Sequence, residues 1–281
     1  MNGEHRAPPP RPSFFTASMR VFDLSLGQML WSRRSVFLGV LLGGPVVMAL
    51  AIRVLSSRLG PLQVNGSGVS GATIFGLMIW LLYIRFIIPV LGVFYGTALI
   101  ADEVDDKTIT YLFTRPIPRG AVLIGKYLAY LASTVLLVLP SVMLVFFLVV
   151  PTGGGNIAQA FPSLVSDFVM LTTGLVAYGA VFAFVGARLK RPLVTGLVFA
   201  FGWEPAVLLF PGYLKRLTVA YYLQALVTHE MPQDSPVSAL LQVFREVPSV
   251  ATSLLSLVVI VGLALWAAAR AVETREYVLE Q

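Results

Sequence analysis

The sequence predicts an all-α, polytopic membrane protein with six transmembrane helices, and three observations carry this prediction. Hydrophobic residues make up 57% of the 281 residues and charged residues only 12%, whereas a soluble domain is roughly 45–50% apolar and about 25% charged. The apolar residues come in runs long enough to cross a bilayer. Lys and Arg are distributed unequally between the connections that join these runs, which predicts that both termini are cytoplasmic. A water-soluble globule and a disordered chain are both excluded.

The N-terminal region, residues 1–34, begins as a polar, Pro-rich segment and continues as an amphipathic one. Its start lacks the apolar stretch and cleavage site of a signal peptide, so we expect a retained cytoplasmic tail. One apolar stripe recurs at helical spacing, formed by Phe15, Met19, Phe22, Leu26, Met29 and Leu30. The stripe predicts a helix that lies in the membrane interface before the first span, with a short soluble helix packed on another surface as the alternative.

Residues 35–270 contain six apolar runs, which predict a six-span transmembrane domain. The runs cover residues 36–52, 74–100, 127–150, 168–187, 193–210 and 250–269. The fifth run contains Glu204 and Pro205, so it is either a continuous span or a half-helix followed by a re-entrant turn. Residues 271–281 are expected to be a cytoplasmic C-terminal tail.

The distribution of positive charge predicts the orientation. Fourteen of the twenty Lys and Arg residues lie in the N-terminal tail, the connection 101–126, the short connection after the fourth run and the C-terminal end, while five lie in the other connections and Arg85 lies inside the second run. Cytoplasmic connections are the ones enriched in Lys and Arg. The connection 101–126 is therefore expected to be cytoplasmic, and the connections 151–167 and 211–249 external.

The residues give no indication of catalysis or of a metal or cofactor site. The chain has no Cys and only two His residues, His5 and His229, so thiolate chemistry and a His-based metal site are not expected. Gly120 to Lys126 fits the first seven positions of a phosphate-binding loop, but Tyr127 stands where Ser or Thr must reach Mg²⁺. We therefore expect no enzyme activity and no cofactor in this chain, and we read its net charge of +6 as membrane topology rather than as a nucleic-acid surface.

The connection 101–126 is the most informative soluble segment. It begins with an acidic cluster that includes Glu103, Asp105 and Asp106, continues as a short amphipathic stretch, and ends at Arg115 and Pro116. Acidic residues at its start and Arg115 at its end suit the dipole of a short helix that stops before the proline. Its apolar face could enter a groove on a partner, and the alternative is a solvated loop.

Two segments resemble the membrane-spanning permeases of ABC-2 type transporters. The first is similar to their first cytoplasmic loop and comprises Ile100 to Glu103, Thr108, Tyr111, Leu112, Arg115, Pro116, Arg119, Gly125 and Lys126. The second is similar to their fifth-span region and comprises Trp203, Glu204, Leu208, Pro211, Gly212, Leu217, Thr218, Tyr221 and Tyr222.

The resemblance implies six spans, an N-terminal elbow helix, cytoplasmic termini and a location in the bacterial cytoplasmic membrane. It also implies that the first cytoplasmic loop is a coupling helix seated on a separate P-loop ATPase subunit, which would bind MgATP. Two permeases, identical or paralogous, would work with two ATPases. The Glu-Ala-Ala loop of importer permeases is not evident, so the resemblance implies export. The residues expected to couple the permease to the ATPase are Glu103, Asp105, Asp106, Thr108, Tyr111, Leu112, Arg115, Pro116 and Arg119.

Two charged residues lie near mid-depth in the predicted spans, Arg85 in the second and Glu204 in the fifth. Each costs about 2.5–3.5 kcal/mol on insertion scales if it faces lipid, so both are expected to face protein or water. They could pair, or line a pathway or gate. The alternative is that backbone carbonyls satisfy Arg85 and water satisfies Glu204.

The best functional prediction is therefore the permease subunit of an ABC exporter. One alternative is a stand-alone ion-coupled transporter that uses Arg85 and Glu204. Another is a membrane assembly factor or scaffold that recruits a cytoplasmic partner through residues 101–126. The sequence does not identify the cargo, although apolar spans with few polar groups favour an amphiphile over a sugar or an ion.

Overall fold

The computed structural model describes residues 13–31, 33–60, 63–64, 67–105, 118–209, 213–227 and 248–274. In these ranges the chain is helical apart from one small antiparallel hairpin between β1 (Gln63–Val64) and β2 (Ser67–Gly68). The prediction of an all-helical, polytopic membrane protein is confirmed.

Five helices of the described chain are long and apolar enough to cross a membrane. They are α2 (Arg33–Leu59), the continuous stretch Gly71–Ala101, α7 (Arg119–Val149), α8 (Ile157–Arg188) and α13 (Val250–Thr274). The stretch Gly71–Ala101 comprises α3 (Gly71–Met78), the π-helix η1 (Ile79–Ile87), α4 (Ile88–Leu91), the π-helix η2 (Gly92–Gly96) and the start of α5 (Ala98–Asp105).

The predicted fifth span differs from the others. It consists of α9 (Pro192–Leu197), the π-helix η4 (Val198–Trp203) and α10 (Glu204–Leu209), and its apolar helix, Pro192–Val207, is shorter than the five long spans. After it come the 3₁₀ turn η5 (Tyr213–Leu217) and α11 (Val219–Gln224). The six apolar runs thus correspond to five long helices and one shorter one.

A proline follows two of the π-helical segments. Pro89 lies two residues beyond η1, and Pro205 lies two residues beyond η4. A proline has no N–H, so the carbonyl four residues before it loses its usual hydrogen-bond donor. A local π-helical register is one way in which a membrane helix provides that carbonyl with another donor. The two charges predicted at mid-depth lie at these irregular segments: Arg85 is within η1, and Glu204 directly follows η4.

Three helices begin with the same cap. Ser13, Ser70 and Ser249 each accept a hydrogen bond from the backbone N–H three residues later, at 3.2 Å in each case. Each serine hydroxyl also bonds to the Thr hydroxyl at that third position. These Ser-x-x-Thr caps begin α1 (Phe14–Leu30), α3 and α13, and they satisfy backbone donors that the helix itself leaves free.

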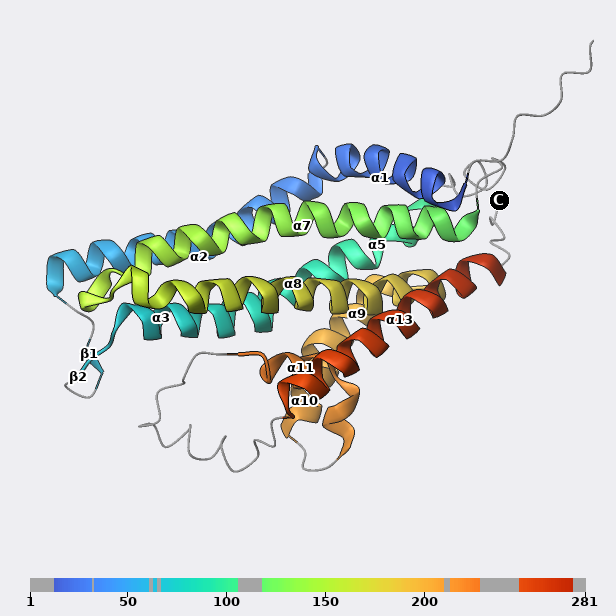
Figure 1. The fold of residues 1–281 in the computed structure, drawn as a ribbon. Helices are drawn as coiled ribbons and strands as arrows, with labels where there is room; N and C mark the ends of the chain where they lie inside the picture. Colours follow the sequence, from blue (N-terminus) through green and yellow to red (C-terminus); the bar gives the residue numbers. More distant parts are fainter. Residues whose placement is uncertain are drawn as a thin grey trace, which may run out of the picture.

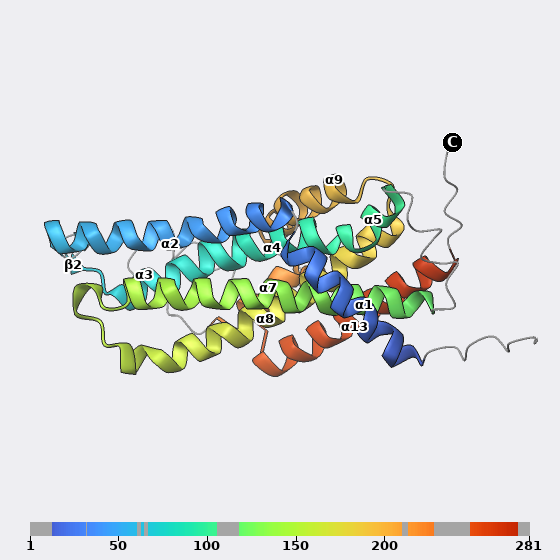
Figure 2. The same cartoon turned by 90° about the horizontal axis from the view of Figure 1, so that it is seen from above.

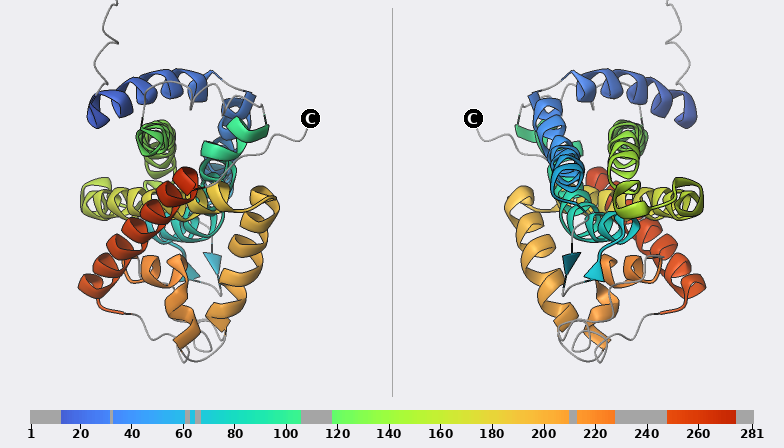
Figure 3. Two further views of the ribbon diagram at one scale, coloured as in Figure 1. Left: turned by 90° about the vertical axis from the view of Figure 1, so that its right-hand side faces the viewer. Right: turned by 90° about the vertical axis from the view of Figure 1, so that its left-hand side faces the viewer.

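The long helices form an elongated bundle (Figure 1). The helices α2 and α8 both pack on α7, and the stretch Gly71–Ala101 packs on α8. Seen from above, α1 crosses α7 diagonally at one end of the bundle, the end at which α5 ends and α7 begins (Figure 2). The helix α13 lies obliquely against α8, and the end views show that α13 and the α9–α10 segment diverge from the bundle on opposite sides (Figure 3).

The amphipathic helix α1 packs mainly through smaller residues beside its predicted apolar stripe. Its buried residues are Ala17, Ser18, Val21 and Ser25. Of the stripe, Phe15 and Met19 are exposed, whereas Phe22, Leu26, Met29 and Leu30 are half-buried. The facing residue on α7 is Gly125, where a Cβ would lie 2.5 Å from the Ser18 carbonyl oxygen and 2.8 Å from the Val21 Cβ. The glycine that resembles part of a phosphate-binding loop therefore permits a close helix–helix contact.

Candidate functional site

The carboxylate of Glu204 is the centre of a polar cluster inside the apolar bundle. Glu204 is only 2% exposed. The Tyr178 hydroxyl donates a hydrogen bond to its Oε2 atom, and the Val219 N–H donates to its Oε1 atom at 2.9 Å. The N–H of Ala220 points at the same carboxylate. Glu204 is thus held by donors from α8 and α11.

The donors from α11 exist because a helix begins there. The first N–H groups of a helix have no partner within it, and the N-terminus carries a partial positive charge. Thr218 caps α11 by accepting a bond from the Tyr221 N–H at 3.4 Å, while Val219 and Ala220 turn their N–H groups to Glu204. The carboxylate therefore holds α11 against the predicted fifth span.

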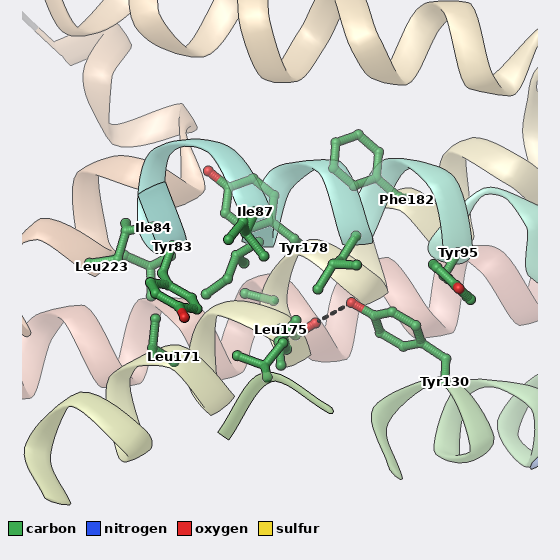
Figure 4. Close-up of a cluster of buried hydrophobic side chains, with 14 of the residues drawn as sticks. Tyr83, Ile84, Ile87, Tyr95, Tyr130, Leu171, Leu175, Tyr178, Phe182 and Leu223 are labelled. Carbon is green, nitrogen blue, oxygen red and sulfur yellow. Dashed lines mark hydrogen bonds between the residues drawn. The ribbon is translucent and has the colours of Figure 1, made fainter. Parts of the chain in front are cut away.

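Tyr178 is held in place by close helix packing. Its ring stacks on Phe182 with centroids 6.0 Å apart and an interplanar angle of 11°. A Cβ at Gly92 in η2 would lie 2.8 Å from the Tyr178 Cβ and 2.9 Å from the Phe182 Cδ2. Glycine at this position lets the second span approach α8. Figure 4 shows Tyr178 and Phe182 among the buried side chains of this region, with Ile87 beside Tyr178.

Arg85 is the second predicted mid-depth residue, and the structure places it near Glu204 without joining the two directly. It lies in η1, fourteen residues after Gly71 and sixteen before Ala101. Its side chain is half-buried, and its guanidinium lies 5.2 Å from the centroid of the Trp80 ring. It is within electrostatic range of Glu204 and Tyr178. Among the described residues, however, the hydrogen-bond donors on Glu204 come from α8 and α11.

The second and fifth spans also touch through aromatic rings close to these charges. The Phe86 and Phe201 rings, from η1 and η4, have centroids 5.9 Å apart. Phe182 of α8 makes an edge contact with Phe199 of η4 at 6.1 Å. The π-helical segments of two spans and the middle of α8 therefore surround one polar cluster. Such segments are frequent at functional sites.

The predicted coupling residues that the structure describes lie at the end of the bundle where α1 begins. Glu103 and Asp105 are in the last turns of α5, and Arg119 is the first residue of α7, where its Nη1 donates to the Glu273 carbonyl of α13 at 3.2 Å. The remaining predicted coupling residues lie outside the described residues: Asp106, Thr108, Tyr111, Leu112, Arg115 and Pro116. The start of α7, at one described end of the predicted coupling loop, thus lies next to the end of α13.

Two buried polar features were not found from the sequence. The first is Asp167, which the sequence analysis assigned to the external connection 151–167. In the structure it is the eleventh residue of α8 and is fully buried. The cap at Asn156, which accepts from the Ala158 N–H at 2.9 Å, extends α8 beyond the predicted start of the fourth span, and an Asn before an apolar run was the available signal.

The other missed feature is a buried relay between three spans. Ser141 of α7 donates to the Leu42 carbonyl of α2 at 3.1 Å, so the Tyr83 hydroxyl must donate to Ser141 at 2.8 Å. It depends on residues far apart in the sequence, and no local pattern marks it. Among the described residues, no cluster of three or more His, Cys, Asp or Glu side chains could hold a metal ion.

Fold and site together define a multi-pass helical membrane protein with charged residues packed into its spans, which is typical of a transporter subunit. The comparison with known families then identifies it more closely. The family described as ABC-2 family transporter protein matches residues 15–271, and the chain belongs to this family. Members typically lack an ATPase domain of their own, which implies an ABC ATPase partner. No individual curated protein matches the chain.

Proposed function

We propose that the chain is the permease subunit of an ABC exporter in the bacterial cytoplasmic membrane, and that ATP hydrolysis on a separate P-loop subunit drives it. The observation that carries this proposal is the family match over residues 15–271, which extends from the first turn of α1 to the last turns of α13. Two permeases, identical or paralogous, would assemble with two ATPases. MgATP would bind to the partner and not to this chain.

The coupling surface is proposed at the end of the bundle where α5 ends and α7 begins. Residues 101–126 form the predicted coupling loop, and at one of its described ends the start of α7 packs against α1 and the last turn of α13 (Figure 1). A movement of this loop would be transmitted to two long helices, the second span, which ends in α5, and α7. The excess of Lys and Arg in these connections supports a cytoplasmic position for this end and for both termini.

The translocation pathway is proposed beside the polar cluster, between the second and fifth spans. Arg85 and Glu204 are its pathway or gate residues. The second and fifth spans both contact the middle of α8, so a movement of either span would change the geometry of the cluster. A rearrangement at the coupling loop would be transmitted along the continuous helix Gly71–Ala101, which carries Arg85.

The test is co-purification of the full chain from native membranes in mild detergent, with identification of bound proteins. We expect a P-loop ATPase, lost when residues 104–115 are replaced by a Gly/Ser linker of equal length. The matched control replaces residues 232–243, in the connection predicted to be external, and should retain the ATPase. A chain that purifies without an ATPase would overturn the proposal.

A second variant separates coupling from assembly. Arg115→Glu combined with Leu112→Ala should abolish ATP-driven transport in vesicles while the chain still folds. Normal transport by this double variant would refute the coupling assignment. An assembled complex without any substrate flux would instead support the scaffold alternative.

A further inference from the structure

Arg85 has hydrogen-bonding capacity that the described part of the chain does not use. A guanidinium presents five N–H donors and no acceptor. Its direct contact is with the Trp80 ring, which provides a cation–π interaction but no lone pair for those donors. The residue stands about 21 Å along the helix from Gly71, near the middle of the span, and its side chain is only half-buried. A charge in that position is expected to face water or a ligand.

Glu204 does not take up these donors. Its Oε2 atom accepts from the Tyr178 hydroxyl and its Oε1 atom accepts from the Val219 N–H, with the Ala220 N–H on the same side. The carboxylate therefore has its own set of donors from α8 and α11. It attracts Arg85 electrostatically, but the edge of the guanidinium is left for another anion.

The surface around Arg85 is aromatic and open. The neighbouring Phe86 is 48% exposed, and Phe201 of the facing span is 39% exposed. The Phe86 and Phe201 rings contact each other, so these two side chains form one apolar surface across η1 and η4. A cation beside an apolar surface is complementary to a molecule with an anionic group and an apolar body.

We propose that Arg85 binds the anionic group of an amphiphilic cargo, whose apolar part lies against Phe86 and Phe201. The guanidinium edge suits a carboxylate or a phosphate group, which can accept two parallel N–H bonds. This inference rests on the proposed export function and names its substrate class. It assigns Glu204 to the structure of the pathway wall and Arg85 to contact with the cargo.

The test uses fluorescence of Trp80, which already touches Arg85. The chain has four Trp residues, and replacing Trp31, Trp203 and Trp266 by Phe leaves Trp80 as the only one. The full-length chain in phosphatidylcholine vesicles is titrated with dodecyl phosphate, with dodecylphosphocholine, which has the same alkyl chain without net charge, and with inorganic phosphate. We expect a saturable change with dodecyl phosphate at a concentration at least about tenfold below that for dodecylphosphocholine, and none with inorganic phosphate.

Variants assign that preference to one side chain. Arg85→Gln should remove the preference for the anionic amphiphile, and Arg85→Lys should retain part of it because the charge remains while the two-bond geometry is lost. Arg58→Gln, an exposed arginine in the last turn of α2, is the matched control and should behave like the parent. Equal responses to the two amphiphiles, or an unchanged preference in Arg85→Gln, would overturn the inference, and a response to inorganic phosphate would indicate a free-anion site instead.

The chain that retains Arg85 already shows whether the anionic amphiphile is preferred. The substrate class is therefore tested even if the Arg85→Gln variant does not fold. The titration needs no ATPase. Its failure therefore overturns the substrate class alone, whereas an unaltered chain that co-purifies with no ATPase overturns the export function.

Discussion

The two intramembrane charges, Glu204 and Arg85, have opposite surroundings. Glu204 is almost completely buried, and each of its carboxylate oxygens accepts a hydrogen bond. Arg85 is half-buried against an aromatic ring, and in the described part of the chain its N–H donors have no carboxylate or carbonyl acceptor. A membrane protein can satisfy a buried charge with its own hydrogen-bonding groups, or leave the charge accessible to water or a ligand. The first arrangement contributes to the stability of the fold, and the second is available for function.

The difference originates in what each helix meets. Glu204 faces the start of α11, whose free N–H groups need an acceptor, and the hydroxyl of Tyr178. Arg85 lies in the second span near its contact with the fifth, where exposed aromatic side chains are the neighbours. The comparison therefore predicts that substitutions around Glu204 change stability, and that substitution of Arg85 changes binding.

Glu204→Ala should give the largest loss of stability. The substitution leaves the Tyr178 hydroxyl and the Val219 N–H buried without their acceptor, and each unsatisfied group costs about 1–3 kcal/mol. We expect the free energy of unfolding to fall by about 3 kcal/mol, measured by circular dichroism during SDS titration in mixed micelles. Glu204→Gln keeps an acceptor oxygen and should lose less. An unchanged unfolding curve for Glu204→Ala would remove the basis of the comparison.

Tyr178→Phe should have a smaller effect, because the carboxylate keeps its bonds from α11. A hydrogen bond to a charged group contributes about 1.5–3 kcal/mol, so we expect a loss of about 2 kcal/mol in the same titration. In the Glu204→Ala background the substitution should be nearly neutral, since the acceptor is already gone. Additive losses in the double variant would show that the two side chains stabilise the fold independently.

Thr218→Ala tests the start of α11 itself. It removes the side chain that accepts from the Tyr221 N–H, and loss of such a cap costs about 1 kcal/mol. The same substitution type at the cap of an unrelated helix, Ser249→Ala, is the control for a cap without a buried carboxylate nearby. We expect hydrogen exchange of the α11 amides to accelerate in Thr218→Ala and not in Ser249→Ala.

The sequence predicts the long helices well because their signal is local. Hydropathy and length define the spans, and the family resemblance indicated by Arg115, Pro116 and their neighbours is confirmed by the match over residues 15–271. The shorter fifth helix was harder to predict. Its composition is apolar to residue 210, but it contains Glu204 and Pro205, so the sequence left both a span and a re-entrant turn open. In the structure the helix continues through both residues, and its irregular part is the π-helix η4 just before them.

The polar partners could not be predicted, because they come from distant parts of the chain. Nothing near Glu204 in the sequence indicates Tyr178, twenty-six residues earlier, or the Val219 N–H, fifteen residues later. The amphipathic stripe of α1 was also incomplete as a guide. The helix α1 approaches α7 closely at Gly125, so small side chains such as Ala17 and Ser18 fit between the two helices, whereas Phe15 remains exposed.

Arg85→Gln should have the smallest effect on stability, although it has the largest expected effect on binding of the anionic amphiphile. The wild-type guanidinium contributes no hydrogen bond that the described chain accepts, so its removal loses only the Trp80 contact and a long-range attraction to Glu204. We expect the free energy of unfolding to fall by no more than about 0.5 kcal/mol in the same SDS titration, and a rise would be consistent with the cost of holding a charge at mid-depth. A loss as large as that of Glu204→Ala would mean that Arg85 stabilises the cluster directly, and the division between a structural and a cargo-binding charge would then fail.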